Sequence, residues 1–278
     1  MNKLITMMTD WTYAEGAIGA CKGVIKSIDS SLEIIDITHE IPAYDIYAAS
    51  FRLKQVLPFW PKETVFMVVV DPGVGTSRRP VVAKTLSGHF IVTPDNGTLT
   101  HINALIGLEE VRIIDNKHRL WSSHHTNVFH GRDIFAYVSA KLSSDQLSFE
   151  DIGEVLVDPI ITFELKEPSR DHDTLQGMIE IVDPNFGNAW TNIPIQWLVS
   201  FQSNEHTIFD ILITSQGTTI HLKAVFAPTF GHVSKGECVL YHNELDHVAI
   251  AINQESFIKT YNVSYGPEWI IEIRRTHD

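Results

Sequence analysis

A short motif that joins a carboxylate to two arginines is the clearest candidate for chemistry in this sequence. Asp71 follows the unbroken apolar run 65–70 and opens the segment Asp71-Pro72-Gly73-Val74-Gly75-Thr76-Ser77-Arg78-Arg79. An ionised carboxylate only accepts hydrogen bonds, so it suits a ribose diol, an ammonium group or the proton of a water molecule. A neighbouring guanidinium keeps such a carboxylate ionised and oriented.

The two arginines of this motif begin the next expected strand. Because successive side chains of a strand face opposite sides, only one of Arg78 and Arg79 can point at Asp71. The plain alternative is a glycine-rich hairpin with two solvated arginines. The loop is not a Walker motif, because no Gly-Lys-Ser/Thr follows.

A second aspartate, Asp10, closes the first expected strand as Asp71 closes the buried one. Ligands of α/β proteins usually bind at the carboxyl ends of such strands. Taken alone, Asp10 is better explained as the cap of a helix or a turn.

Three histidines precede an expected helix in the segment His124-His125-Thr126-Asn127-Val128-Phe129-His130-Gly131-Arg132-Asp133. Histidine is a common zinc ligand, so a metal site is one interpretation. Adjacent His124 and His125 are awkward co-ligands, however, and the sequence has no HExxH motif. Taken alone, His130 is more readily explained as structural than as catalytic.

The segment Asp183-Pro184-Asn185-Phe186-Gly187-Asn188-Ala189-Trp190-Thr191-Asn192 gathers aromatic, amide and acidic side chains in one expected turn. Asparagine can pair with an adenine edge, and aromatic faces attract a sulfonium or ammonium cation. A β-turn with Trp190 in the core explains any one of these residues equally well.

Two domains of different fold class must position these residues. Up to residue 165, strand patterns alternate with helix patterns, which predicts an α/β domain with a mainly parallel, Rossmann-like central sheet. The expected strands are 4–8, 32–37, 65–70, 80–84, 89–92 and 111–114, and the expected helices are 15–28, 44–57 and 132–142.

After this domain the pattern changes. The polar segment 166–174 is an expected linker. Residues 175–278 then read as a small all-β domain, either a barrel or a sandwich, with one short helix near 256–261. Its expected strands are 178–182, 207–214, 218–226, 238–241 and 248–252.

Composition limits the possible partners and compartments. The 278 residues carry a formal net charge of −13, which argues against nucleic acid as a partner. The two cysteines, Cys21 and Cys238, are far apart and lack a CxxC neighbour, which fits a reducing cytoplasm. No apolar run approaches the roughly 18 residues that a membrane span needs, and the first residues do not resemble a signal peptide.

Together the motifs resemble the adenosine-forming S-adenosylmethionine (SAM) hydrolases, also called SAM hydroxide adenosyltransferases, which are relatives of the fluorinase and chlorinase. The resemblance covers nearly the whole chain, in order and with compatible spacing. It rests on Thr9-Asp10, the segment 71–79, Pro94-Asp95-Asn96-Gly97, Phe129-His130-Gly131-Arg132-Asp133 and the segment 183–188.

The resemblance implies that water attacks SAM, giving adenosine and methionine, without a cofactor or a metal. It also implies a homotrimer, in which each site lies between the first domain of one subunit and the second domain of its neighbour. The halogenases of this group, represented by the fluorinase, have a tyrosine in place of Asp71 and a serine in place of Gly131, so this chain falls with the hydrolases.

The resemblance further implies a role for each site residue. Asp71, Arg78 and His130 would activate water. Asp10 would hold the ribose hydroxyls, Tyr44 would line the region of the ribose and the sulfonium, and Asp183 would meet the methionine ammonium. The adenine would be bound by Phe186, Asn188, Trp190, Phe230 and Asn253.

One segment departs from the family. A serine, or a serine and an arginine, usually stands where this chain has Asn243-Glu244-Leu245-Asp246-His247. A glutamate there would repel the substrate carboxylate, which leaves open what binds that end. This departure keeps a non-catalytic adenosine or SAM-binding sensor as an alternative. A halogenase and a metal-dependent hydrolase built on the histidines are further alternatives.

Overall fold

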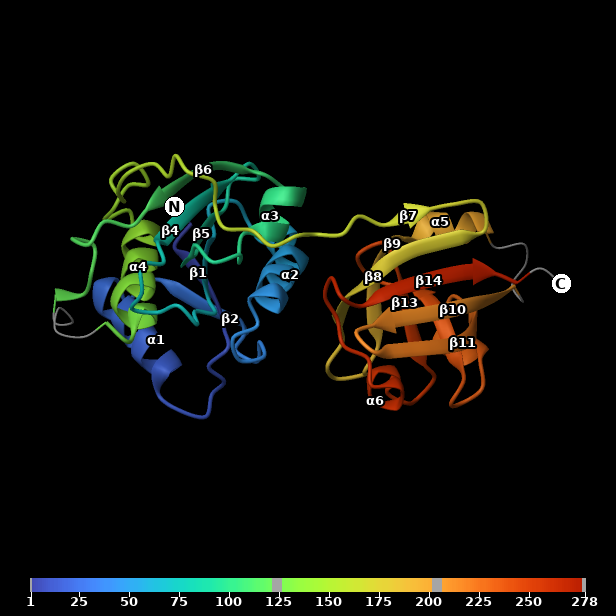
Figure 1. Ribbon diagram of the computed structural model, residues 1–278. Coiled ribbons are helices and arrows are strands. Elements are labelled where there is room, and N and C mark those ends of the chain that lie inside the picture. The colour runs from blue at the N-terminus through green and yellow to red at the C-terminus, as the bar shows by residue number, and fades with distance from the viewer. Residues whose placement is uncertain (1, 122–126, 202–206, 277–278) are drawn as a thin grey trace. The chain divides into compact units, whose positions relative to one another are not determined.

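The computed structural model of the protein describes residues 2–121, 127–201 and 207–276 (Figure 1). The chain divides into two compact units, unit 1 (residues 1–163) and unit 2 (residues 164–278). Each unit has its own sheet and its own hydrophobic core.

Unit 1 is built on a six-stranded sheet with the strand order β2-β1-β3-β5-β4-β6. Strand β1 pairs in parallel with β2 and β3, and β3 pairs in parallel with β5. Strand β4 is antiparallel to both of its neighbours, β5 and β6. The strands are β1 (Leu4–Thr9), β2 (Glu33–Thr38), β3 (Val65–Val69), β4 (Pro80–Thr85), β5 (Phe90–Pro94) and β6 (Leu108–Ile113).

This sheet is mixed, rather than the mainly parallel, Rossmann-like sheet that the sequence predicts. The reason is the connection from β4 to β5, which consists only of residues 86–89 and turns at Gly88, with a φ of 87°. Parallel neighbours need a crossover of a dozen or more residues, so two strands joined this closely pair as an antiparallel hairpin.

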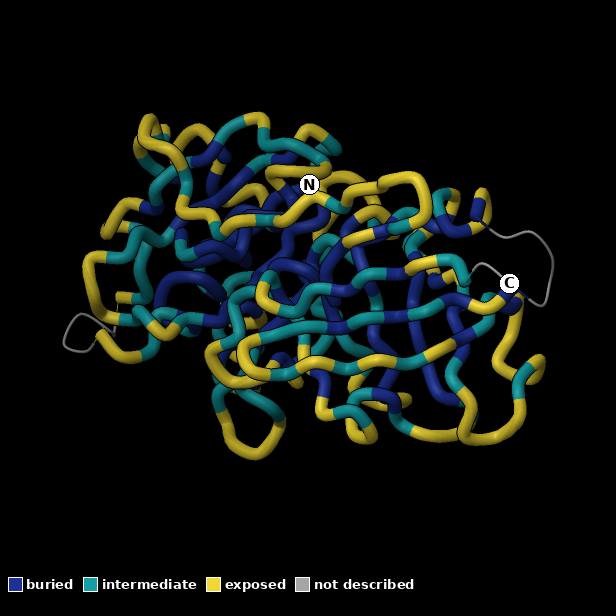
Figure 2. The backbone as a smooth tube through the Cα atoms, turned by 45° about the vertical axis from the view of Figure 1, so that its right-hand side comes forward, coloured by how far each residue is buried: buried dark blue, intermediate teal, exposed yellow. Residues whose placement is uncertain are grey.

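Helices cover both faces of the sheet in unit 1. Figure 1 shows α1 beside α4 on one side, and α2 beside α3 on the other. The buried residues of α1 follow helical spacing, at Ile18, Cys21 and Ile25. All five residues of β3 are buried, which explains its unbroken apolar sequence. Buried backbone is dark blue in Figure 2. The helices are α1 (Ala17–Ile28), α2 (Ile46–Val56), α3 (Thr100–Leu105), α4 (Tyr137–Ser143), a 3-10 turn η1 (Leu57–Phe59) and a π-helical turn η3 (Gly131–Ala136).

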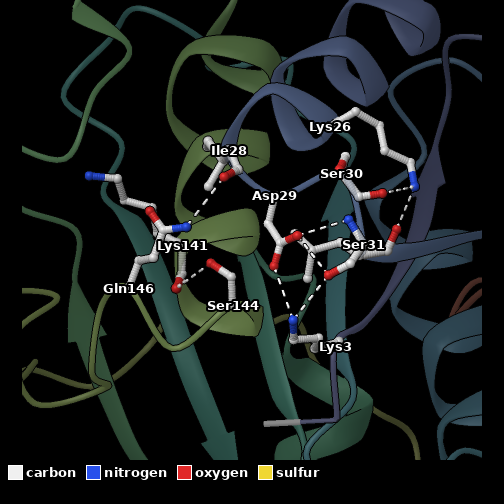
Figure 3. Close-up of polar contacts among 10 residues, drawn as sticks. Lys3, Lys26, Ile28, Asp29, Ser30, Ser31, Lys141, Ser144 and Gln146 are labelled. Atoms are coloured by element: carbon white, nitrogen blue, oxygen red, sulfur yellow. Dashed lines mark hydrogen bonds and ion pairs between the residues drawn. The ribbon is translucent and has the colours of Figure 1, made fainter.

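Side chains fix the turn between α1 and β2. The Oδ1 atom of Asp29 accepts hydrogen bonds from the backbone N and the Oγ of Ser31, at 2.8 and 2.6 Å (Figure 3). The Nζ atom of Lys3 lies 3.3 Å from Oδ2 of the same carboxylate. The hydrogen bonds from Ser31 lower the pKa of Asp29. These contacts hold the starts of β1 and β2 in register, with Leu4 opposite Glu33.

Unit 2 is a closed β-barrel, which decides between the two predicted alternatives. Its strands lie in the order β14-β10-β11-β12-β13-β9-β8-β7, and an additional pairing of β14 with β8 closes the barrel. Strands β11 and β12 are parallel, and the other neighbouring pairs are antiparallel. The strands are β7 (Ser169–Arg170), β8 (Thr174–Val182), β9 (Ala189–Pro194), β10 (Ile208–Ser215), β11 (Thr218–Phe226), β12 (Cys238–His242), β13 (His247–Ile252) and β14 (Ile270–Arg275).

Three strands of unit 2 are absent from the sequence prediction. Strand β7 lies within the expected linker, and β14 was not expected. The expected turn at 183–192 is too long, because β9 begins at Ala189. Thr191 and Asn192 interrupt the apolar pattern of this strand, although both are buried. Their polar atoms have partners inside the barrel: Thr191 Oγ1 donates to the carbonyl of Val248 at 2.7 Å, and Asn192 Oδ1 accepts from the backbone N of Met178 at 2.8 Å.

Short helices complete unit 2: α5 (Ile195–Phe201), α6 (Phe257–Tyr261) and the 3-10 turn η4 (Phe230–His232). Across the described ranges of both units, every helix is either too short or too polar to cross a membrane.

Candidate functional site

The predicted site residues of unit 1 lie at the carboxyl ends of β1 and β3. These strands are parallel neighbours, with Thr9 opposite Val69. Asp10 directly follows β1, and Asp71 lies just beyond the end of β3. Both line a cavity of about 490 Å³, together with Trp11, Glu15, Ala17, Ala43, Tyr44, Val69, Val74, Val128, Phe129, His130 and Gly131.

Arg78 joins Asp71 to His130 at this cavity. Its Nε donates to Oδ1 of Asp71 at 2.9 Å, and its Nη2 donates to Oδ2 of the same carboxylate. The same Nη2 lies 3.0 Å from Nδ1 of His130. The side chains of Arg78 and Asp71 are only 8% and 7% exposed, and the guanidinium lies 5.2 Å from the ring centre of Phe135. A bidentate hydrogen bond from a buried guanidinium fixes the orientation of the carboxylate.

The turn after β3 is tight and leaves no room for a side chain at Gly75. The backbone N and the Oγ1 of Thr76 both donate to the carbonyl of Gly73, at 3.1 and 2.7 Å. Gly75 has a φ of 77°, and a Cβ there would lie 2.9 Å from the carbonyl oxygen of Asn127. The turn therefore packs directly against the segment that leads to His130.

The adjacent arginine has a different partner, as predicted, although both arginines precede β4 instead of beginning it. The Nη2 and Nε atoms of Arg79 lie 2.6 and 2.9 Å from Oδ2 of Asp95, which is 1% exposed. The other oxygen of Asp95 accepts from the backbone N of Ile161 at 2.8 Å. Arg79 therefore anchors a neighbouring segment, and Arg78 is the partner of Asp71.

Burial and charge shift the pKa values of two groups at this site. Burial raises the pKa of Asp71 above its usual range, and the charge of Arg78 opposes that rise. Burial lowers the pKa of His130, and the charges of Arg78 and Arg119 lower it further. Perturbed pKa values of two groups that line one cavity mark that cavity as a candidate functional site.

His130 directly precedes the π-helical turn η3, a type of turn that recurs at functional sites. Within this turn, Oδ1 of the fully buried Asp133 accepts a hydrogen bond from Nε of Arg132 at 2.7 Å. His124 and His125 lie outside the described residues. Among the residues that are described, no group of three His, Cys, Asp or Glu side chains is placed to hold a metal ion.

Asp10 and Tyr44, which line the same cavity, are in direct contact. The backbone N of Tyr44 donates to Oδ2 of Asp10 at 2.9 Å. Tyr44 has a φ of 69°, and its side chain is 72% exposed. A bulky residue in this region of φ is uncommon and tends to be kept where a site requires it.

A second cavity, of about 520 Å³, lies in unit 2 and brings together four predicted site residues: Phe186, Asn188, Phe230 and Asn253. Phe186 is 72% and Phe230 39% exposed, which is unusual for phenylalanine. Aromatic faces beside amide groups suit a purine base. Asn185, Ile252, Gln254, Glu255 and Ser256 complete the lining.

The turn that carries Phe186 packs closely on the wall of this cavity. Gly187 has a φ of 75°, and a Cβ there would lie 2.0 Å from Oγ of Ser256. On the same wall, the amide Nδ2 of Asn253 donates to the carbonyl of Val233 at 2.8 Å. This amide therefore also holds the loop that follows Phe230.

Two predicted residues, Asp183 and Trp190, do not line the second cavity. Asp183 Oδ1 accepts from the backbone N atoms of Asn185 and Phe186, at 3.0 and 3.3 Å, so it orders the turn. The indole Nε1 of Trp190 donates to the hydroxyl of Tyr241 at 3.0 Å.

Tyr241 is a site residue that the sequence reading missed. Its ring packs edge-on against Phe230, with 4.9 Å between the ring centres, and burial raises its pKa to about 12. It therefore links Trp190 to the wall of the cavity. The only sequence signal is a tyrosine in the half-buried part of β12, which core packing explains equally well.

The segment that departs from the family forms the turn between β12 and β13. The Oδ1 atom of Asn243 closes it by accepting from the backbone N atoms of Leu245 and His247, each at 3.0 Å. Glu244 is exposed, and its negative charge contributes to the raised pKa of Tyr241. The carboxylate of Glu244 thus lies at the end of the barrel where β12 turns into β13.

Comparison with known proteins gives a consistent result for both units. Residues 5–153 match the model of the SAM hydroxide adenosyltransferase N-terminal domain, and residues 177–270 match that of the C-terminal domain. The (R)-S-adenosyl-L-methionine hydrolase of Methanocaldococcus jannaschii is 34% identical over 68% of this chain and 66% of that protein. The (R)-S-adenosyl-L-methionine hydrolase of Salinispora tropica is 32% identical over 90% of each.

The fold also has a solved counterpart. The crystal structure of an uncharacterized conserved protein from Thermotoga maritima superposes with a TM-score of 0.86 at 35% identity. The match covers 98% of this chain and 100% of that one.

Proposed function

Because the chain belongs to the family of SAM hydroxide adenosyltransferases, we propose that the cavity of unit 1 is where it attacks SAM with water. The chain is an S-adenosyl-L-methionine hydrolase, which forms adenosine and L-methionine. The observation that carries our assignment of the site is the buried contact of Arg78 with both Asp71 and His130.

The reaction we propose is an in-line displacement at the C5′ carbon of the ribose. The leaving group is a neutral thioether that departs from a sulfonium, so no general acid, metal or cofactor is required. The site must hold a water molecule opposite the C5′–S bond and accept one of its protons. Positioning can supply much of the acceleration for such a step.

The contacts of Arg78 support Asp71 as the proton acceptor. A guanidinium only donates hydrogen bonds, so Nδ1 of His130 accepts from Arg78 and carries no proton. Neutral His130 then has its proton on Nε2, which is buried and has no partner within the described ranges. In this state His130 has no lone pair free to take the proton, whereas each oxygen of Asp71 has a further lone pair for it.

The remaining residues would hold the substrate. We assign Asp10 to the ribose hydroxyls, because its Oδ1 has no partner among the described residues, and Tyr44 to the region of the ribose and the sulfonium. We assign Phe186, Asn188, Phe230 and Asn253 to adenine, with Trp190 acting through Tyr241, and Asp183 to the methionine ammonium.

We further propose a homotrimer, in which unit 1 of one subunit and unit 2 of its neighbour together form each active site. The division of the predicted residues between two separate cavities, one in each unit, supports this arrangement. The test mixes an Asp71→Ala variant with an Asn188→Ala variant. If the sites are shared, mixed trimers regain activity that neither variant has alone; if each chain forms its own site, mixing restores nothing.

We place the enzyme in the cytoplasm, without a nucleic-acid or membrane partner. A net charge of −13 would repel a polyanion, and both cysteines are free. Fractionation of cells and immunodetection of the chain would test the compartment.

The origin of the new oxygen tests the reaction. In ¹⁸O-water, the label should appear in the 5′-hydroxyl of adenosine and not in methionine. Added chloride or fluoride should give no 5′-halo product, because Asp71 would repel an anion, and chelators should leave the rate unchanged. Adenosine without label, or a halogenated nucleoside, would contradict the assignment of the water-activating residues.

A further inference from the structure

The indole of Trp11 lies against the backbone of Gly131. A Cβ atom at Gly131 would lie 2.3 Å from Cη2 and 2.7 Å from Cζ2 of Trp11, and 3.2 Å from Cε2 of Phe129. Real Cβ atoms do not approach other atoms so closely. The far edge of the indole therefore occupies the space that any side chain at position 131 would need.

Several contacts keep the indole in this position. The backbone N of Trp11 donates to Oγ1 of Thr9 at 3.3 Å, and the backbone N of the next residue donates to the carbonyl of His39 at 2.8 Å. The ring packs edge-on against Phe129, with 5.6 Å between ring centres, and also packs against the core of unit 1. Phe129 in turn lies 5.1 Å from the guanidinium of Arg132. A ring held on this many sides does not move aside easily.

The place of this ring is next to the proposed chemistry. Trp11 lines the same cavity as Asp71 and His130, and His130 immediately precedes Gly131 in the chain. Neither Asp71 nor His130 limits the size of the group that they bind, since each offers a polar atom at its tip. Of the aromatic side chains that line the cavity, Trp11 has the atoms nearest to the Cβ position of Gly131, the residue next to His130.

We propose that Trp11 determines the specificity of the reaction for water, by excluding nucleophiles larger than a water molecule from the position beside His130. This inference rests on the proposed function of the unit 1 cavity. A short-chain alcohol has the same hydroxyl chemistry as water and differs in bulk, so the enzyme rejects it by size.

The reaction with methanol balances in the same way as hydrolysis. The methanol oxygen forms a bond to C5′ of SAM, the C5′–S bond breaks, and its electron pair stays on sulfur as neutral methionine. The hydroxyl proton passes to the carboxylate of Asp71. The products are 5′-O-methyladenosine and methionine, and no oxidant, reductant or further reactant is needed.

The test measures the ratio of 5′-O-methyladenosine to adenosine in water–methanol mixtures. The wild-type protein should disfavour the extra methyl group by about 10–200-fold relative to water at equal concentration, as tight pockets do. Trp11→Leu vacates more than the roughly 30 Å³ that one water molecule fills, so it should remove most of this preference. Because both products form in one reaction, the ratio does not depend on how much protein is folded.

Trp60→Leu is the matched control. Trp60 is also a half-buried tryptophan of unit 1, packed 6.2 Å from the ring of Phe66, but it does not line the cavity. Its product ratio should equal that of the wild type. An unchanged ratio in Trp11→Leu, or an equal rise in Trp60→Leu, would overturn the inference. A wild-type protein that forms no adenosine would instead overturn the proposed function itself.

A double substitution tests the contact independently, in case Trp11→Leu folds poorly. Gly131→Ala alone should lower the rate of adenosine formation sharply, because its methyl group overlaps the indole. In Trp11→Leu/Gly131→Ala the overlap is absent, so the alanine should cost little relative to Trp11→Leu. Equal losses from Gly131→Ala in both backgrounds would show that the indole does not occupy this space.

Discussion

Replacing Arg78 or Arg79 by alanine removes a guanidinium from a buried carboxylate in each case, but only one of these carboxylates lies in the cavity. Arg78 contacts Asp71, which is 7% exposed, and Arg79 contacts Asp95, which is 1% exposed. We expect both variants to be less stable than the wild type. Only Arg78→Ala should change the chemistry.

The expected loss of stability follows from the burial of the two pairs. Removing one partner of a buried ion pair costs about 3–5 kcal/mol, because the other charge remains without compensation. At about 2–4 °C per kcal/mol, this lowers the melting temperature by on the order of 6–20 °C for a unit of this size. The loss should be smaller for Arg79→Ala, because Arg79 is 27% exposed and Asp95 keeps its hydrogen bond from Ile161.

The pH dependence of kcat separates the two variants. Burial raises the pKa of Asp71 and Arg78 opposes the rise, so without Arg78 the carboxylate holds its proton to higher pH. Since the reaction needs ionised Asp71, activity appears as the pH rises through this pKa. The acid limb should therefore move to higher pH in Arg78→Ala and stay in place in Arg79→Ala. At a pH below the shifted acid limb, where Asp71 is protonated, loss of the proton acceptor should cost about 10²–10⁴-fold.

The assay follows adenosine release by chromatography at temperatures below the melting point of every variant. Arg78→Lys is the intermediate case, because an ammonium keeps the charge but cannot make the forked contact. An acid limb that stays in place in Arg78→Ala would refute the role of Arg78. An equal shift in Arg79→Ala would mean that the effect comes from general loosening of unit 1.

Three further substitutions give separate readouts. Asp71→Ala should abolish turnover yet leave adenosine binding, measured by calorimetry, largely intact, because nucleoside recognition is assigned elsewhere. Asp10→Ala should weaken adenosine binding and abolish discrimination against 2′-deoxyadenosine. An unchanged preference for adenosine would mean that Asp10 only caps a helix or a turn. Gly187→Ala should lower the free energy of unfolding in urea by about 1–3 kcal/mol, because its Cβ would lie 2.0 Å from Ser256 Oγ. Gly217→Ala is the control: the space around Gly217 is open, so this variant should cost only the strain of its positive φ.

The local geometry around Asp71 could be predicted because it depends on short-range rules. An unbroken apolar run placed a buried strand before Asp71, and the alternation of side chains along a strand required Arg78 and Arg79 to diverge. In the structure β3 is buried throughout, and the two arginines contact different aspartates, although both lie just before β4 and not within it. The role proposed for His130 came from the family resemblance, since taken alone this residue is more readily explained as structural.

Features that depend on distant segments could not be predicted in the same way. The closure of the barrel requires β14 to pair with β8, across most of unit 2, and no local pattern encodes that pairing. The position of Trp11 against Gly131 likewise joins residues that are far apart in sequence. Tyr241 belongs to this class too, because its relation to Trp190 depends on how the strands of the barrel align.

In the mechanism we propose, one guanidinium favours the protonation state that each of its two neighbours needs, which explains the use of an arginine. Water activation needs Asp71 ionised, although burial favours its neutral form, and Arg78 supplies the charge that opposes burial. It also needs His130 neutral; burial lowers the pKa of His130, and the same charge lowers it further. Only the planar guanidinium group of an arginine can donate hydrogen bonds to both oxygens of Asp71 and to Nδ1 of His130 at once. The acid limb of the rate profile and the tautomer of His130 should therefore change together in any variant of Arg78, which ¹⁵N spectra of the labelled imidazole can follow.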